Sequence, residues 1–200
     1  HAPDGLDAEG EARRILRKFL WRGFFTSRYE RGTNSRTLAD YRPLVEILEG
    51  RDSGPPPIFN ESLPTVDDLM LASWPKKRDR LARAILLVTL RSGGLDLADG
   101  SPACRESLQA REYHHIFPVS ILEERGVNSS QIYRALNCAL VTWRTNRAIA
   151  AKSPIEYIRH RVDASTLGEH EIRRRLSSHQ IDYDVLTKGD YDAFLRHRAE

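Results

Sequence analysis

Two adjacent histidines and two asparagines further along the chain are the residues best suited to chemistry. His114 and His115 lie in the run Tyr-His-His-Ile-Phe-Pro, and Asn137 and Asn146 follow, nine positions apart. An imidazole has an ordinary pKa of about 6.5, so it can take a proton from water at neutral pH. A second imidazole and an amide oxygen can hold a divalent cation, which stabilises developing charge on a phosphate. These residue types therefore indicate metal-assisted hydrolysis of a phosphodiester.

A purely structural interpretation of the same residues has to be weighed against this one. Histidines with satisfied ring nitrogens pack in many protein cores, and an asparagine such as Asn137 can simply cap a turn. Two histidines before Ile-Phe-Pro, followed by two spaced asparagines, are harder to explain in that way. We therefore prefer the functional interpretation of the pair. No catalytic role is assigned to the scattered histidines His160, His170, His179 and His197.

Two strands and a helix are the elements that must position these side chains. Residues 112–118 are predicted to form a short strand that ends at its proline, because proline restricts both itself and its predecessor. Residues 139–142 predict a second strand, and a helix is expected to begin near Asn146. Adjacent residues of a strand point to opposite faces, so His114 and His115 are not expected to do the same job in the same place.

The residues of this stretch resemble the HNH, or ββα-metal, nucleases. The resemblance rests on His-His-Ile-Phe-Pro, on Asn137 before Ala-Leu-Val, and on Thr-Asn-Arg followed by Lys-Ser-Pro within residues 145–154. More narrowly, the chain resembles the C-terminal half of GmrSD-type and SspE-type modification-dependent restriction enzymes, in which a helical segment precedes the HNH unit. The resemblance covers most of the chain, and its central motif is more specific than the flanking helices.

The resemblance implies a role for each residue of the motif. His115 is expected to be the general base, and His114 and Asn146 are expected to bind a divalent metal. Mg²⁺ is the metal expected, with Mn²⁺ or another transition metal as alternatives. Asn137 is expected to hold the loop and orient the base. His114 stands where many members carry Asp, and Asn146 where many carry His, so this uncharged pair should bind metal more weakly.

Basic residues near Asn146 are candidates for contacts to nucleic-acid phosphates. Arg144, Arg147 and Lys152 lie close to it in the sequence, although an ordinary solvated helix face is the alternative. The formal net charge is only +3, but lysine accounts for just five of the 31 basic residues. The planar guanidinium of arginine suits two-pronged phosphate contact. A bias in codon usage explains the arginine content equally well.

Composition and periodicity around the motif predict a mainly α-helical fold. The hydrophobic fraction of 40% and the charged fraction of 30% are typical of globular proteins. Apolar residues recur at helical spacing over residues 8–29, 37–48 and 76–90. We therefore expect a mainly α fold with a small ββα-metal insert, organised as one compact domain. Its parts are a helical scaffold at 1–92, the nuclease unit at 93–160, and C-terminal helices at 161–200 that pack on the scaffold.

Two further features bear on the setting in which the protein works. No apolar run approaches the roughly 20 residues that cross a bilayer, so no membrane partner is expected. Cys104 and Cys138 form no Cys-x-x-Cys pair. This spacing argues against a zinc ribbon, does not demand a disulfide, and favours a reduced, cytoplasmic setting.

The function expected from the resemblance is that of a divalent-metal-dependent HNH endonuclease that nicks or cleaves double-stranded DNA. It would be the nuclease domain of an anti-phage, modification-dependent restriction system. The resemblance also implies an N-terminal, NTP-using domain that senses the modification in the full-length protein. Two alternatives stay open: a ββα module that binds DNA or regulates with little or no catalysis, and an RNA-cleaving HNH-like toxin domain.

Overall fold

The computed structural model describes residues 5–51, 54–75 and 79–200. Over these residues the protein is mainly α-helical and contains one two-stranded antiparallel sheet. The chain forms two compact units, His1–Thr65 and Val66–Glu200. The expected segment boundaries after residues 92 and 160 both lie inside the second unit.

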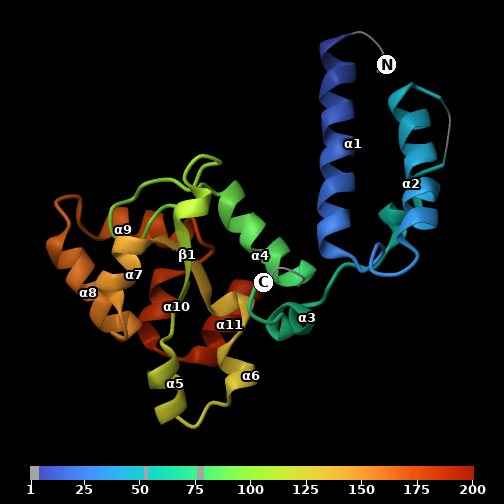
Figure 1. Ribbon diagram of the computed structural model, residues 1–200. Helices are drawn as coiled ribbons and strands as arrows, with labels where there is room; N and C mark the ends of the chain where they lie inside the picture. The colour runs from blue at the N-terminus through green and yellow to red at the C-terminus, as the bar shows by residue number, and fades with distance from the viewer. Residues whose placement is uncertain (1–4, 52–53, 76–78) are drawn as a thin grey trace. The chain divides into compact units, whose positions relative to one another are not determined.

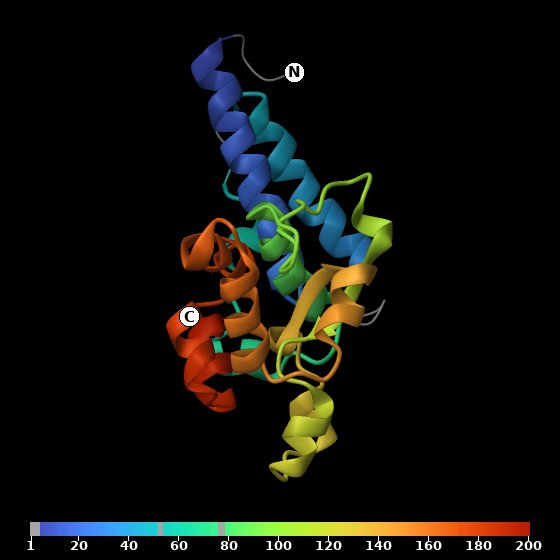
Figure 2. The same ribbon diagram turned by 90° about the vertical axis from the view of Figure 1, so that its left-hand side faces the viewer.

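The first unit is built on two long helices. Helices α1 (Leu6–Phe25) and α2 (Thr33–Leu48) run side by side in opposite directions (Figures 1 and 2). The 3-10 helix η1 (Pro57–Asn60) packs against both of them. The helices agree with the apolar periodicity at residues 8–29 and 37–48, although α1 ends four residues earlier than that pattern.

A buried carboxylate joins the parts of the first unit. Asp40 is fully buried and accepts hydrogen bonds from Arg28 Nε at 2.5 Å and from the Tyr29 hydroxyl at 2.9 Å. Its other oxygen accepts the backbone N–H of Ile58 at 2.9 Å. A buried charge is tolerated only when it is paired and hydrogen-bonded in this way. Asp40 therefore ties the segment after α1, helix α2 and η1 together.

The second unit contains the two strands and the remaining helices. None of the described helices combines the length and the apolar character needed to cross a lipid bilayer. The helices of this unit are, in chain order, α3 (Val66–Leu71), α4 (Arg80–Arg91), η2 (Leu108–Ala110), α5 (Val119–Glu124), α6 (Ser129–Ile132), η3 (Ala135–Asn137), α7 (Trp143–Ile149), α8 (Pro154–Ala164), α9 (Gly168–Ser177), α10 (Tyr183–Lys188) and α11 (Tyr191–Ala199). The first residues of the helix predicted at 76–90 lie outside the described residues.

The two strands and the helix that follows them give a β-β-α order. Strand β1 (Arg111–His115) pairs antiparallel with β2 (Cys138–Thr142), and His115 lies opposite Cys138. Helix α7 follows β2 at once and contacts both strands. Figure 1 shows β1 in the middle of the second unit, with α7 beside it. This order agrees with the elements predicted at residues 112–118, at 139–142 and near Asn146.

The boundaries of these elements differ slightly from the predicted ones. Strand β1 ends at His115, because the chain turns there and Pro118 becomes the residue that precedes helix α5. Helix α7 begins at Trp143, earlier than expected. The Thr142 hydroxyl accepts a hydrogen bond from the backbone N–H of Thr145, which caps the helix at that point.

The hairpin is held between two groups of apolar side chains. Four of the five residues of β2 are buried. A small cluster comprising Leu86, Cys138 and Leu140 has Trp74 and Leu90 packed against it. The larger core includes Ala139, Val141, Phe117, Leu122, Ile132, Leu136, Ile172, Leu176 and Phe194. Because strand residues alternate, β2 contributes to both groups and is fixed on both faces.

Candidate active site

A chain of hydrogen bonds links three polar side chains between β1 and α7. His114 Nδ1 lies 2.8 Å from Asn146 Oδ1, and Asn146 Nδ2 donates to Glu112 Oε2 at 2.6 Å. Glu112 and His114 are two residues apart in β1, so their side chains share one face of the strand. Because the Asn146 oxygen accepts the bond, Nδ1 of His114 carries the proton and Nε2 keeps its lone pair.

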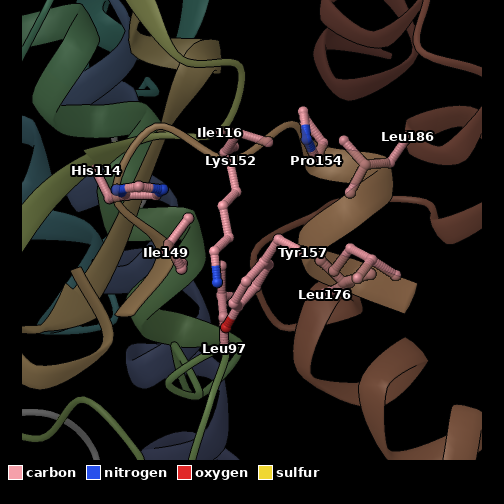
Figure 3. Close-up of a pocket in the computed structure, with 10 residues that line it drawn as sticks. Leu97, His114, Ile116, Ile149, Lys152, Pro154, Tyr157, Leu176 and Leu186 are labelled. Carbon is pink, nitrogen blue, oxygen red and sulfur yellow. The ribbon is translucent and has the colours of Figure 1, made fainter. Parts of the chain in front are cut away.

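The His114 ring is buried and neutral. It is 6% exposed, and burial lowers its pKa below the ordinary value, although the hydrogen bond with Asn146 opposes that change. The ring borders a pocket that Lys152 and Tyr157 also line, and Figure 3 shows one ring nitrogen directed toward it. The other residues that line the pocket are apolar: Leu97, Ile116, Ile149, Pro154, Ile158, Leu176 and Leu186. A neutral imidazole is the form that binds metals.

The three linked side chains carry the atom types that a divalent cation accepts: the Glu112 carboxylate, the amide oxygen of Asn146 and Nε2 of His114. In the structure these side chains bond to one another, with Nδ1–H of His114 and Nδ2 of Asn146 as the donors at 2.8 Å and 2.6 Å. An ion held by all three would replace those hydrogen bonds. Among the described residues, no group of three His, Cys, Asp or Glu side chains could hold an ion. A site here therefore depends on the oxygen of Asn146 together with His114 and Glu112.

Glu112 is the site residue that reasoning from the sequence missed. The signal that could have found it is the alternation of a strand, because a residue two positions before His114 points to the same side. A carboxylate gives the site one negative charge, which the predicted pair of His114 and Asn146 lacks. Oxygen ligands with negative charge are those that Mg²⁺ and Mn²⁺ prefer.

His115 points to the opposite side of β1, as strand alternation predicts. Its ring stacks on the Trp74 indole, with centroids 3.9 Å apart and planes 15° apart. The Tyr133 ring stands perpendicular to it at 4.9 Å. Nε2 is buried and has no hydrogen-bond partner among the described residues, so Nδ1 is the nitrogen left to reach water.

The electrostatic surroundings keep the His115 imidazole neutral. Burial, with a smaller contribution from the neighbouring His114, lowers the pKa of His115 to about 4. A neutral ring is the form that accepts a proton, although a pKa this low makes it a weaker base than a solvated imidazole. The two histidines of the motif therefore lie back to back, one beside Asn146 and one beside Trp74.

Asn137 holds the turn that follows β1. Its side chain is fully buried and accepts the backbone N–H of Phe117 at 2.8 Å. The amide group donates to the carbonyls of Phe117 at 3.1 Å and Ile132 at 3.2 Å. Its own backbone carbonyl accepts the N–H of Ile116 at 2.9 Å. These bonds fix the chain directly after His115, so the position of that residue depends on Asn137.

The basic residues near Asn146 lie in two places. Arg144 and Arg147 are exposed on α7, and the Arg147 guanidinium lies over the exposed Trp143 ring at 4.3 Å. Lys152 instead lines the pocket beside His114. The two arginines, three positions apart, are neighbours on the helix surface.

Comparison with known proteins identifies a distant relative. The chain is 21% identical over 190 residues to a Methanocaldococcus jannaschii protein described as "Uncharacterized protein MJ0686". The alignment covers 88% of this chain and 32% of the relative, so the chain spans about a third of that protein's length. No family model matches the chain, and no solved structure matches it.

A buried carboxylate outside the motif fixes the helix that carries Asn146. Asp96 is fully buried and accepts the backbone N–H of Thr142 at 2.6 Å and the Thr145 hydroxyl at 2.5 Å. Arg111 lies 3.4 Å from the same carboxylate. Burial raises the pKa of Asp96, but these and further hydrogen bonds outweigh it, and the pKa lies below its ordinary value. Asp96 is therefore ionised and holds the start of α7.

Proposed function

We propose that the second unit is a divalent-metal-dependent endonuclease that hydrolyses phosphodiester bonds of double-stranded DNA. One observation carries the proposal. Glu112, His114 and Asn146 meet in a single hydrogen-bonded chain between β1 and α7, and His115 follows His114 in the strand with its ring on the opposite face. The β-β-α order and the motif that resembles the HNH nucleases support the same assignment.

The residues divide the work of hydrolysis between them. Glu112, His114 and Asn146 would hold the metal, which supplies Lewis-acid stabilisation of the charge on the phosphate. His115 takes a proton at Nδ1 from the water whose oxygen attacks phosphorus. The bond from phosphorus to the 3′ oxygen breaks, and the leaving oxygen takes a proton from solvent. The products are a 5′-phosphate and a 3′-hydroxyl.

Arg144 and Arg147 are the best placed of the expected cations to contact the DNA backbone. Both are exposed on the helix that carries Asn146. Contacts of this kind fix the position of the duplex without reading its sequence. The proposed role in a modification-dependent, anti-phage restriction system, with an NTP-using sensor domain on the N-terminal side, rests on the sequence resemblance.

Binding without cleavage is a second candidate function, and one observation favours it. Burial, with a smaller contribution from His114, lowers the pKa of His115 to about 4, which weakens the ring as a base. A unit of this kind would bind DNA with an affinity that falls steeply with salt. Its binding would not respond to a chelator.

Nicking of supercoiled plasmid in Mg²⁺ or Mn²⁺ tests the proposed function. We expect cleavage that EDTA abolishes and that His115→Ala lowers by about 100-fold or more. The matched control is His160→Ala, because His160 is exposed on α8, and this variant should cut like the parent. Equal cutting by His115→Ala would remove His115 as the base. Binding of DNA with no cleavage under any metal would favour the second function, and preferential cutting of RNA offered in the same tube would assign a different substrate.

A further inference from the structure

The Trp74 indole lies flat against the imidazole of His115. The two ring centroids are 3.9 Å apart and the planes differ by 15°. The torsion that rotates an imidazole about its bond to Cβ is broad and has little intrinsic preference. A ring that lies flat on a second ring cannot turn through a right angle without driving its edge into that neighbour. The contact therefore selects one plane for the His115 ring.

Trp74 is itself held firmly enough to impose that plane. The rings of Tyr113 and Tyr133 stand nearly perpendicular to the indole at 6.3 Å and 5.9 Å, an arrangement that aromatic pairs favour. The indole also packs on the cluster that contains Leu86. The preceding residue, Ser73, forms an isolated antiparallel bridge with Arg134. Contacts on several sides thus fix Trp74 within the second unit.

Within the selected plane, burial decides which nitrogen of His115 can act. Nε2 is buried without a hydrogen-bond partner among the described residues, so no hydrogen bond from them at this nitrogen orients the ring. Stacking therefore does for His115 what a hydrogen bond does for His114. It holds the ring in the plane in which Nε2 is buried, so Nδ1 is the nitrogen left to reach water.

We propose that Trp74 is a positioning residue for His115, holding the imidazole by stacking so that Nδ1 faces the water to be deprotonated. This inference rests on the proposed function of His115 as the general base. It assigns to Trp74 no contact with the substrate or the metal. A flat aromatic ring at position 74 is the property that matters, and apolar bulk alone is insufficient.

Two substitutions separate stacking from simple filling of space. Trp74→Phe keeps a flat ring, whereas Trp74→Leu keeps apolar volume without one. We expect Trp74→Phe to retain kcat for plasmid nicking within about threefold, and Trp74→Leu to lower kcat by about 10- to 100-fold, as a misplaced reacting group does. KM and the Mn²⁺ concentration at half-maximal rate should change in neither variant. Trp21→Leu, in the first unit, is the matched control and should leave kcat unchanged.

The ring protons of His115 give a second readout that needs neither metal nor DNA. In NMR spectra of the full chain, an imidazole that lies over an indole face is shifted upfield by the ring current. The signal, assigned by its loss in His115→Gln, should move downfield in Trp74→Leu and stay upfield, by a smaller amount, in Trp74→Phe.

The outcomes distinguish this inference from the proposed function. If Trp74→Phe and Trp74→Leu cut equally well, or if the His115 signal is unchanged in Trp74→Leu, Trp74 does not position the base, and the nuclease assignment stands. If the parent chain does not cut in any metal, the nuclease assignment fails, and the proposed role of Trp74 in catalysis fails with it. Loss of kcat in Trp74→Leu together with the NMR shift supports the inference.

Discussion

The side-chain amide of Asn146 donates a hydrogen bond to Glu112 over 2.6 Å, which joins a helix residue to a strand residue 34 positions earlier in the chain. The same amide group faces His114 through its oxygen. A neutral asparagine thus lies between the imidazole of His114 and the carboxylate of Glu112. The metal affinity of the site should accordingly depend on Glu112, although that residue lies outside the His-His-Ile-Phe-Pro run.

Glu112→Gln should weaken metal binding without unfolding the protein. Glutamine can still accept the hydrogen bond from Asn146, but it carries no charge. We expect Mn²⁺ affinity, measured by isothermal titration calorimetry, to fall by about 10- to 100-fold, as for other groups that support or ligate a metal. The matched control is Glu123→Gln on the exposed side of α5. Unchanged Mn²⁺ affinity in Glu112→Gln would exclude the carboxylate from the site.

Asn137→Ala should destabilise the second unit strongly. The change removes the acceptor of the Phe117 N–H and the donor to two carbonyls in a fully buried place. At about 1 kcal/mol for each bond, the free energy of unfolding in urea should fall by about 3 kcal/mol. Asn128→Ala removes an exposed helix cap of α6 and should cost about 1 kcal/mol. Similar losses in both variants would contradict the role given to Asn137.

The buried His179 should make stability fall as the pH falls from about 7 to 4. Burial lowers the pKa of His179 to about 4, and its Nε2 lies 2.7 Å from the Leu95 carbonyl. Because the unfolded chain has an ordinary histidine pKa of about 6.5, it binds the proton first. Protonation between these two values therefore favours unfolding, and the contribution of His179 at pH 5 is about 2 kcal/mol below that at pH 7.

Urea unfolding at pH 7 and pH 5 measures this dependence. His179→Gln keeps a donor near the Leu95 carbonyl and removes the titrating group, so its stability should fall by about 2 kcal/mol less between the two pH values. His114 and His115 titrate in both proteins, and their effect cancels in the comparison. The matched control is His197→Gln, because His197 is exposed on α11. Equal pH dependence of parent and His179→Gln would contradict the prediction.

Removing Arg144 and Arg147 together should weaken DNA binding in a salt-dependent manner. Each phosphate contact adds about 0.9 to the slope of log affinity against log salt. The double alanine variant should lower that slope by about 2 if each arginine contacts one phosphate. Fluorescence anisotropy with labelled duplex in EDTA measures binding without cleavage. Arg173→Ala is the control, because Arg173 is already paired with Glu169 and Asp184. An equal change of slope in Arg173→Ala would contradict specific phosphate contacts by Arg144 and Arg147.

Local sequence patterns were sufficient to predict the hairpin and the helix that follows it. The mainly helical fold with a small antiparallel pair of strands is confirmed, and the strands lie at the predicted places because alternation and a proline define them locally. The roles of His114, His115 and Asn146 stay predictions, although His114 and Asn146 do meet in space.

Contacts between distant parts of the chain could not be read from the sequence. Trp74 lies 41 positions before His115, and the sequence around it carries no signal that it stacks there. The choice of Glu112 as third member of the site needed the position of α7 as well as the strand face. The division between residues 65 and 66 likewise depends on where long-range packing ends, which no local pattern marks.

The hydrogen bonds of Asp96 order the candidate site during folding, before any metal ion binds. It accepts bonds from Thr142 and Thr145 and lies against Arg111, so one carboxylate fixes the start of β1, the end of β2 and the first turn of α7. The loss of conformational freedom at Asn146 therefore takes place when the chain folds and not when an ion arrives. A cation would meet a backbone that is already ordered, and little of its binding free energy would be consumed in ordering the strands and helix that carry the ligands.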